Sequence, residues 1–190
     1  MKLIDSILKK SAHPAFVWVV FFLTVCESIF LFIPPEAFMT PPIVADKKRA
    51  LPVTISAALG SLIGGAITYL IGLWLFDSVG VWLINNFATM DKFELAKQMF
   101  AKNGIFILFV TAFTPVPYKL VAICAGFLHF PILLFLGVSA LFRTSRFAIA
   151  GFLLWKFQEQ ANRLVKKYFW PLTLFAIIFA GLGIFILYLI

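Results

Sequence analysis

The feature that most constrains the fold is the stretch 51–76, an apolar run without a charged side chain. About 20 apolar helical residues cross a hydrocarbon core about 30 Å thick, so this run is long enough to span a bilayer. Of the 190 residues, 63% are hydrophobic and 13% are charged, against about 25% charged in soluble domains. The apolar runs are continuous and do not alternate as barrel strands do. The sequence therefore predicts an all-α polytopic membrane protein, with 1–190 as a single membrane domain.

The hydrophobic segment 15–45 is interrupted in a way that a simple transmembrane helix does not tolerate. It contains Glu27, and Pro34 and Pro35 break it. The apolar part after the break, 37–45, covers about 14 Å as a helix, roughly half of the hydrocarbon core. We therefore predict a re-entrant helical hairpin that leaves the membrane on the side where it entered.

The segment 104–130 repeats this design in the second half of the chain. Two short apolar arms flank Pro115 and Pro117, and neither arm is long enough to span the membrane alone. A long apolar stretch, 132–155, follows this segment, as 51–76 follows the first broken segment. This order is typical of inverted-repeat transport folds. The prediction is two inverted repeats, each a re-entrant helical hairpin followed by a full transmembrane helix.

Four further regions complete the predicted topology. Residues 1–13 are predicted as an amphipathic interfacial helix, and 77–103 as an extracytoplasmic linker with an interfacial helix over 91–102. Residues 156–169 are basic and amphipathic, and 171–190 read as a final, C-terminal transmembrane helix.

The charge distribution predicts the orientation. Residues 1–13 and 46–49 each carry a net charge of +2 and 156–167 carry +3, whereas 77–103 are neutral. If both hairpins are re-entrant, the three basic segments lie on one side, which the positive-inside tendency assigns to the cytoplasm. The N-terminus is then cytoplasmic. The total charge of +8 is explained by contact with anionic lipid headgroups, so nucleic acid is not an expected partner.

Ionisable residues within or against the membrane segments form the candidate site. An unpaired charge at a helix centre costs about 2.5–3.5 kcal/mol, so these residues must face one another or water. Broken backbone is also tolerated at membrane depth only where it is buried in protein or lines a polar cavity. We therefore expect the two breaks to meet near the midplane. The residues are Glu27, Glu36, Lys119, Arg143 and Arg146.

The two kinds of charge indicate two roles. A carboxylate in a low-dielectric cavity can carry a proton, which makes Glu27 and Glu36 candidates for proton coupling. Arg143 and Arg146 are spaced i,i+3 on one helical face, and a guanidinium group binds phosphate well. Lys119 is a third cation that can bind a phosphate headgroup. Two alternatives stay open. The carboxylates can form purely structural ion pairs, and Lys119 can extend to an interface.

Small residues recur along 51–76 at helical spacing. Gly60, Gly64 and Gly72 follow a four-residue period, and Gly65 lies on a neighbouring stripe. Such stripes let another helix backbone approach closely, so these glycines are predicted to pack helices.

At these residues the sequence resembles the DedA family, also called the VTT domain or SNARE-associated Golgi protein family. The stretch from Glu27 to Glu36 resembles the family's motif of two acids around a proline turn, which a glycine-rich helix follows. The stretch from Phe113 to Lys119, with Gly126 after it as a further packing glycine, resembles the family's second re-entrant motif.

The resemblance covers about residues 20–155 and implies lipid translocation in a bacterial inner membrane. Bacterial members are associated with recycling undecaprenyl phosphate or moving phospholipid, with proton coupling proposed, and eukaryotic relatives with lipid scrambling. The family pattern commonly has arginines where this chain has Ala112 and Tyr118, with Lys119 one place later. Expected phosphate binding therefore shifts toward the two arginines that follow.

The leading hypothesis is a flippase or scramblase of phospholipid or polyprenyl phosphate, either coupled to protons or not. Its expected partners are membrane lipids with phosphate headgroups, and no cofactor or metal is expected, because the chain lacks a Cys/His cluster. An assembly factor without transport is the main alternative. An enzyme acting on lipid phosphate is not expected, because no Ser/His pair accompanies the breaks. The oligomeric state stays open, with a homo-oligomer among the options.

Overall fold

Every regular element that the computed structural model describes is a helix, which confirms the predicted all-α class. The described residues are 10–11, 13–30, 34–76, 90–114, 118–161 and 163. Two helices, Lys47–Leu75 and Ile132–Lys156, are long and apolar enough to cross a membrane, judged by length and composition. Several predictions fall wholly or partly outside the described residues: the surface helix at 1–13, the linker at 77–103, Pro115 and Pro117, the segment 156–169 and the span at 171–190.

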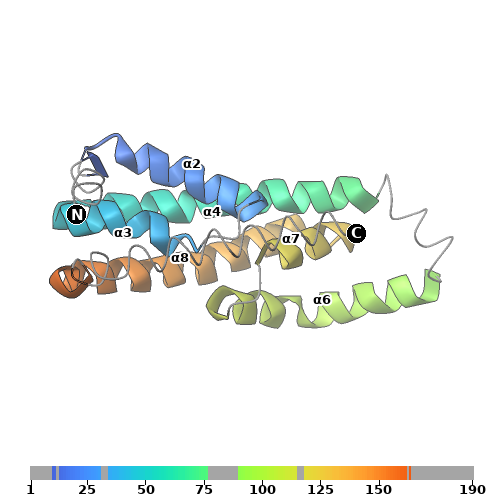
Figure 1. Cartoon of the computed structure of the whole chain (residues 1–190). Coiled ribbons are helices and arrows are strands. Elements are labelled where there is room, and N and C mark those ends of the chain that lie inside the picture. Colours follow the sequence, from blue (N-terminus) through green and yellow to red (C-terminus); the bar gives the residue numbers. More distant parts are fainter. Residues whose placement is uncertain are drawn as a thin grey trace, which may run out of the picture.

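Two long helices form the centre of the fold. α4 (Ala50–Leu75) and α8 (Ile132–Lys156) lie side by side along the molecule and run in opposite directions (Figure 1). They approach closely where Gly151 faces Thr54, because a Cβ on Gly151 would overlap the Thr54 hydroxyl. The remaining helices pack on this pair.

α2 (Phe16–Ile29) packs along the first part of α4 and runs in the same direction. Ser56 donates a hydrogen bond to the Val17 carbonyl at 2.6 Å, and Thr68 donates to the Ser28 carbonyl at 2.9 Å. The two pairs are separated by 39 and 40 residues, as parallel helices require. Because α2 and α4 run in the same direction, the segment between them must bring the chain back to the end of the bundle at which α2 begins.

Glycines make the contact between α2 and α4 close. A Cβ on Gly60 would lie 2.6 Å from the Phe21 carbonyl oxygen, and one on Gly64 would lie 2.6 Å from the Ser28 Cβ. Real Cβ atoms do not occupy such positions, so these glycines allow the backbones of the two helices to touch.

The returning segment is α3 (Glu36–Ala45), which begins after Pro35 and itself contains two prolines. Proline is tolerated at a helix start, where its missing N–H would have no partner. At the other end, the Gln158 side chain donates hydrogen bonds to the Ile43 and Val44 carbonyls at 3.2 and 2.7 Å. Those carbonyls lie in the last turn, where helices leave acceptors unpaired, so Gln158 caps α3.

α7 (Tyr118–Phe127) packs against the second part of α4 (Figure 1). A Cβ on Gly72 would overlap the Ile123 carbonyl, and one on Gly126 would overlap the Tyr69 carbonyl. Each helix therefore contributes a glycine to a close contact with the other.

α6 (Met90–Phe113) differs from the prediction of an interfacial helix over 91–102 and a separate apolar arm from 104. The structure has one continuous helix of 24 residues. A single glycine costs a helix only about 1 kcal/mol, so Gly104 does not break it. Its missing Cβ instead leaves room for the Phe130 ring, which lies 2.8 Å from the position that a Cβ would occupy.

The apolar core consists of two separate clusters. One combines residues of α4, α6, α7 and α8, and the other combines residues of α2, α3, α4 and α8. The first contains Tyr69, Phe100, Leu108, Tyr118, Ala122, Ala125, Phe130 and Phe135, and the second contains Val20, Met39, Ile43, Val53, Ala57, Ala58 and Phe147.

Candidate functional site

Charged residues lie between the two apolar clusters. Along α8, Arg143 comes between Phe135 of one cluster and Phe147 of the other. On α4, Ser61 likewise lies between residues of the two clusters. The charges therefore form a polar layer across the middle of the helix bundle, which we call the charge layer.

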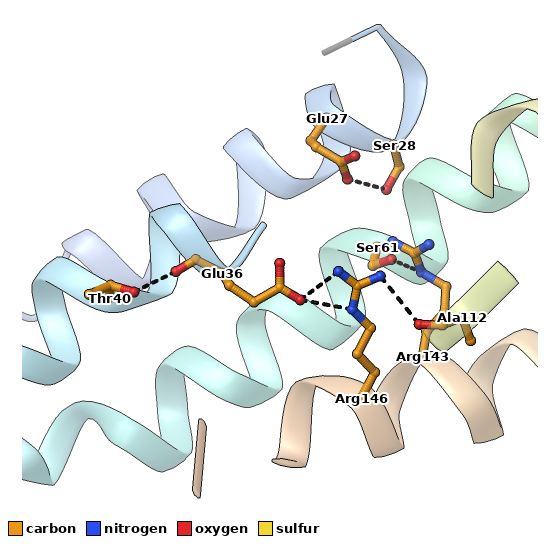
Figure 2. Close-up of polar contacts among 8 residues, drawn as sticks. All are labelled: Glu27, Ser28, Glu36, Thr40, Ser61, Ala112, Arg143 and Arg146. Atoms are coloured by element: carbon orange, nitrogen blue, oxygen red, sulfur yellow. Dashed lines mark hydrogen bonds and ion pairs between the residues drawn. The ribbon is translucent and has the colours of Figure 1, made fainter. Parts of the chain in front are cut away.

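Arg143 is buried in this layer, with 5% of its surface exposed. Its Nε donates a hydrogen bond to the Ser61 hydroxyl (Figure 2). The guanidinium carbon lies 4.0 Å from the centroid of the Tyr118 ring, in the geometry of a cation–π contact. Among the residues that the structure describes, no carboxylate lies within 4 Å of this guanidinium.

Tyr118 is fixed from two sides, which in turn positions Arg143. Its hydroxyl donates a hydrogen bond to Ser139 at 2.8 Å. A Cβ on Gly65 would lie 2.8 Å from that hydroxyl, so the glycine provides the space that the Tyr118 side chain occupies. The sequence predicts Gly65 as a packing residue, but it gives Tyr118 only as a position where the family pattern has an arginine. An aromatic residue at the start of a helix, after a proline break, was the available signal.

Arg146 forms the ion pair of the layer. Its Nη2 and Nε atoms lie 2.7 and 2.8 Å from the same carboxylate oxygen, Oε1 of Glu36 (Figure 2). Its Nη1 donates to the Ala112 carbonyl at 3.2 Å. About a third of each side chain is exposed, 32% for Arg146 and 30% for Glu36. One arginine on α8 thus links α3 and α6, and its contact with the carboxylate uses a single oxygen.

Glu27 stands apart from this pair. Its carboxylate accepts a hydrogen bond from Ser28 at 3.4 Å, and it takes part in none of the ion pairs among the described residues (Figure 2). It interacts electrostatically with Arg143, Lys119 and Arg146 over longer distances. The two candidate acids therefore have different surroundings.

Lys119 lies inside the bundle, with 6% of its surface exposed. Its ammonium group donates a hydrogen bond to the main-chain carbonyl of Glu27 at 2.8 Å. That carbonyl belongs to the last turn of α2, where a cation is favourable because helix carbonyls point outward. The structure therefore does not place this lysine at an interface.

All five predicted ionisable residues lie in the charge layer. They come from four helices, α2, α3, α7 and α8. Pro34 and Pro35 immediately precede Glu36 and hold it at the start of α3. Pro115 and Pro117 lie outside the described residues.

In the part of the chain that the structure describes, every element is a helix, two helices are long and apolar enough to cross a membrane, and a charge layer lies between the two apolar clusters, as is typical of a membrane protein. Residues 43–156 match the VTT domain, and the chain belongs to this family. The family membership confirms the resemblance drawn from the sequence and supports a membrane location. The match includes Lys119, Arg143 and Arg146, whereas Glu27 and Glu36 precede it.

Two relatives match along nearly their whole length. An uncharacterized protein of Haemophilus influenzae is 27% identical over 178 residues, which cover 92% of each chain. An uncharacterized HI0703 homolog of Histophilus somni is 31% identical over 180 residues, which cover 93% of this chain and 94% of the relative. No solved structure matches the chain.

Proposed function

We propose that this protein moves phosphate-bearing lipids between the two leaflets of a membrane, as a flippase or scramblase of phospholipid or polyprenyl phosphate. The observation that carries the proposal is the ion pair between Glu36 and Arg146. It joins a helix that starts at a proline break to a helix apolar enough to span a membrane, and it is partly exposed. Ionisable residues within membrane segments are rare and commonly mark functional sites.

The helix lengths support a re-entrant first hairpin, whereas α6, with 24 residues, is long enough to cross the hydrocarbon core. α2 has 14 residues and α3 has 10, about 21 and 15 Å of helix, and neither reaches across a hydrocarbon core of about 30 Å. α7 also has 10 residues. The parallel packing of α2 and α4 supports the same topology, because α3 then returns the chain to the side on which α2 began.

The packing of the arms on the long helices supports the two inverted repeats. α2 packs on α4 as α6 packs on α8, and α7 packs on α4 as α3 packs on α8. α6 and α8 run in the same direction, since Phe109 contacts Phe142 and Ala112 contacts Arg146 one turn later. α2 and α4 are related in the same way.

The short helices that pack on the long helix of the other half, α3 on α8 and α7 on α4, are also parallel to it. Glu36 of α3 contacts Arg146 of α8, and Val44 of α3 contacts Gln158, just past the end of α8, so these helices run in the same direction. Along α7 and α4, Tyr118 faces Gly65 and Ile123 faces Gly72, which is again parallel. Each long helix thus carries one arm from its own half and one from the other.

Arg146 is the residue that we assign to the lipid phosphate. A guanidinium group binds phosphate and carboxylate with the same donor geometry, so a lipid phosphate can replace Glu36 on Arg146. The released Glu36 carboxylate would then be stabilised by taking a proton, because a lone charge at this depth is costly. Exchange of one anion for the other couples lipid binding to protonation.

Arg143, Lys119 and Glu27 have supporting roles in this proposal. Arg143 provides a fixed positive charge, since Ser61 and Tyr118 hold it in place. Lys119 contributes a second cation at the end of α2. Glu27 lies within electrostatic range of these cations without an ion pair among the described residues, and is the second proton carrier.

We place the protein in the bacterial inner membrane, with the N-terminus in the cytoplasm. The basic turn Lys47–Arg49 precedes α4, and α2 begins at the same end of the bundle because it runs parallel to α4. Lipids with phosphate headgroups, and protons, are the proposed partners.

The proposal is tested by reconstituting the full chain into liposomes and measuring the movement of labelled lipids across candidate headgroups. We expect phosphate-bearing lipid to change leaflet faster than in empty liposomes. A pH gradient that alters this rate would establish the coupling. Rates equal to those of empty liposomes for every headgroup, with and without a pH gradient, would contradict the proposal.

A further inference from the structure

A groove of about 330 Å³ opens between the beginning of α4 and the end of α8. These two helix termini lie at the same end of the bundle (Figure 1). Its polar rim carries Lys47 and Lys48, and its apolar wall is formed by Leu51, Phe152 and Trp155. None of the ionisable residues of the charge layer lines it. The groove is therefore separate from the charge layer.

The floor of the groove offers no free polar group. Gly151 and Thr54 lie there in direct contact, which brings the two helices together. The Thr54 hydroxyl donates its hydrogen bond to the Ala50 carbonyl at 2.7 Å, within its own helix. A hydrocarbon chain can therefore lie in the groove without leaving a buried hydroxyl unpaired.

The rim is held in place by Asp46. Its carboxylate accepts a hydrogen bond from the Lys48 backbone N–H at 3.0 Å and pairs with Arg49 at 3.6 Å. Lys47 and Lys48 are exposed, and their ammonium groups form none of the ion pairs within the described part of the chain. Two cations thus face the groove while the neighbouring acid is occupied.

A third cation adds to this charge. The Lys156 ammonium lies 6.0 Å from the centre of the Phe152 ring, which belongs to the groove wall. Trp155 is next to it, and tryptophan is enriched at the level of lipid headgroups. The groove therefore combines lysines with an apolar wall, as basic pockets for anionic lipids do.

We propose that this groove binds one anionic phospholipid as a resident lipid. The phosphate lies between Lys47 and Lys48, and one acyl chain lies along Leu51, Phe152 and Trp155. The groove volume is at the lower end of that of ligand sites, so it holds the headgroup and the start of a chain. The groove prefers lipids whose headgroup carries a net negative charge, because two lysines face the headgroup.

The test uses the full chain in detergent micelles with lipids that carry bromine on their acyl chains and quench tryptophan on contact. The Trp155 signal is the difference between the chain and Trp155→Phe. We expect brominated phosphatidylglycerol to quench this signal at a concentration about thirtyfold lower than brominated phosphatidylcholine. Lys47→Gln with Lys48→Gln should abolish this preference. Lys97→Gln with Lys102→Gln, two lysines of α6 that do not line the groove, is the control and should retain it.

A second variant tests the apolar part of the site without changing charge. Ala148 lines the groove and is exposed, so Ala148→Phe fills it from the outside. This substitution should weaken quenching by both lipids. Equal quenching by both lipids in the unmodified chain, a preference that survives removal of the two lysines, or quenching unaffected by Ala148→Phe would each overturn the proposal. None of these results depends on whether the protein moves lipids.

Discussion

The Lys119 ammonium group donates its 2.8 Å hydrogen bond to the main-chain carbonyl of Glu27 rather than to the Glu27 carboxylate. One residue thereby joins α7, from the second half of the chain, to the end of α2, from the first half. The positive charge also meets the negative end of the α2 dipole. Lys119 therefore holds the two broken segments together, and this hydrogen bond does not engage the Glu27 carboxylate.

We expect Lys119→Met to destabilise the fold. Hydrogen bonds to charged groups contribute about 1.5–3 kcal/mol, and methionine keeps the length of the side chain without the donor. The midpoint of thermal unfolding in detergent should fall, while that of Lys102→Met, at an exposed position of α6, should stay unchanged. Equal midpoints for the two variants would show that the contact with α2 adds nothing to stability.

Gly65→Ala should disturb the arginine pocket. The added Cβ would lie 2.8 Å from the Tyr118 hydroxyl, and overpacking of this kind typically costs about 1–3 kcal/mol. A methyl group added at Gly137 on α8 would meet no atom within 4 Å, so Gly137→Ala is a matched control that should stabilise its helix by up to about 1 kcal/mol. Chemical unfolding in detergent compares the two. A Gly65→Ala protein as stable as Gly137→Ala would contradict the close packing.

Substitutions of Tyr118 separate its ring from its hydroxyl. Tyr118→Phe keeps the ring over Arg143 and loses only the bond to Ser139, about 1 kcal/mol. Tyr118→Leu also loses the cation–π contact, about 2 kcal/mol for a desolvated cation. Unfolding free energies should therefore fall in the order tyrosine, phenylalanine, leucine. If leucine is tolerated as well as phenylalanine, the ring does not stabilise the buried arginine.

The two candidate acids should respond differently to neutralisation. Glu36→Gln leaves Arg146 without its ion pair and should lower stability by about 1 kcal/mol or more. Glu27→Gln should leave stability nearly unchanged, since Glu27 takes part in no ion pair among the described residues. Both should reduce proton-dependent lipid movement. Loss of stability in Glu27→Gln alone would reverse the roles assigned to the two acids.

The sequence predicted the helical class, the break at Pro34 and Pro35, and the residues of the charge layer, because these follow from local rules. Proline removes a backbone donor wherever it stands, and charge is costly in any apolar segment. The partners of each charge were not predictable in this way. They depend on how α3, α7 and α8 meet, which hydrophobicity alone does not encode, as the pairing of Arg146 with Glu36 illustrates.

The continuity of α6 shows a second limit. A change from polar to apolar composition at Gly104 suggested two elements, yet composition changes the environment of a helix without ending it. The role of Gly104 became clear only from the Phe130 ring packed against it. Tyr118 was missed for a related reason, because an aromatic residue at the start of a helix does not by itself indicate a cation–π contact.

The most direct test of the proposed function compares lipid movement by the unmodified chain and by Arg146→Ala, both reconstituted at equal amounts of folded protein. Removing one charge-assisted phosphate contact should slow the initial rate at least about tenfold, toward that of empty liposomes. Lys102→Ala removes an exposed lysine from α6 and should move lipid at the unmodified rate. Arg146→Ala moving phosphate-bearing lipid as fast as Lys102→Ala would contradict a lipid-binding role for the pair of Glu36 and Arg146.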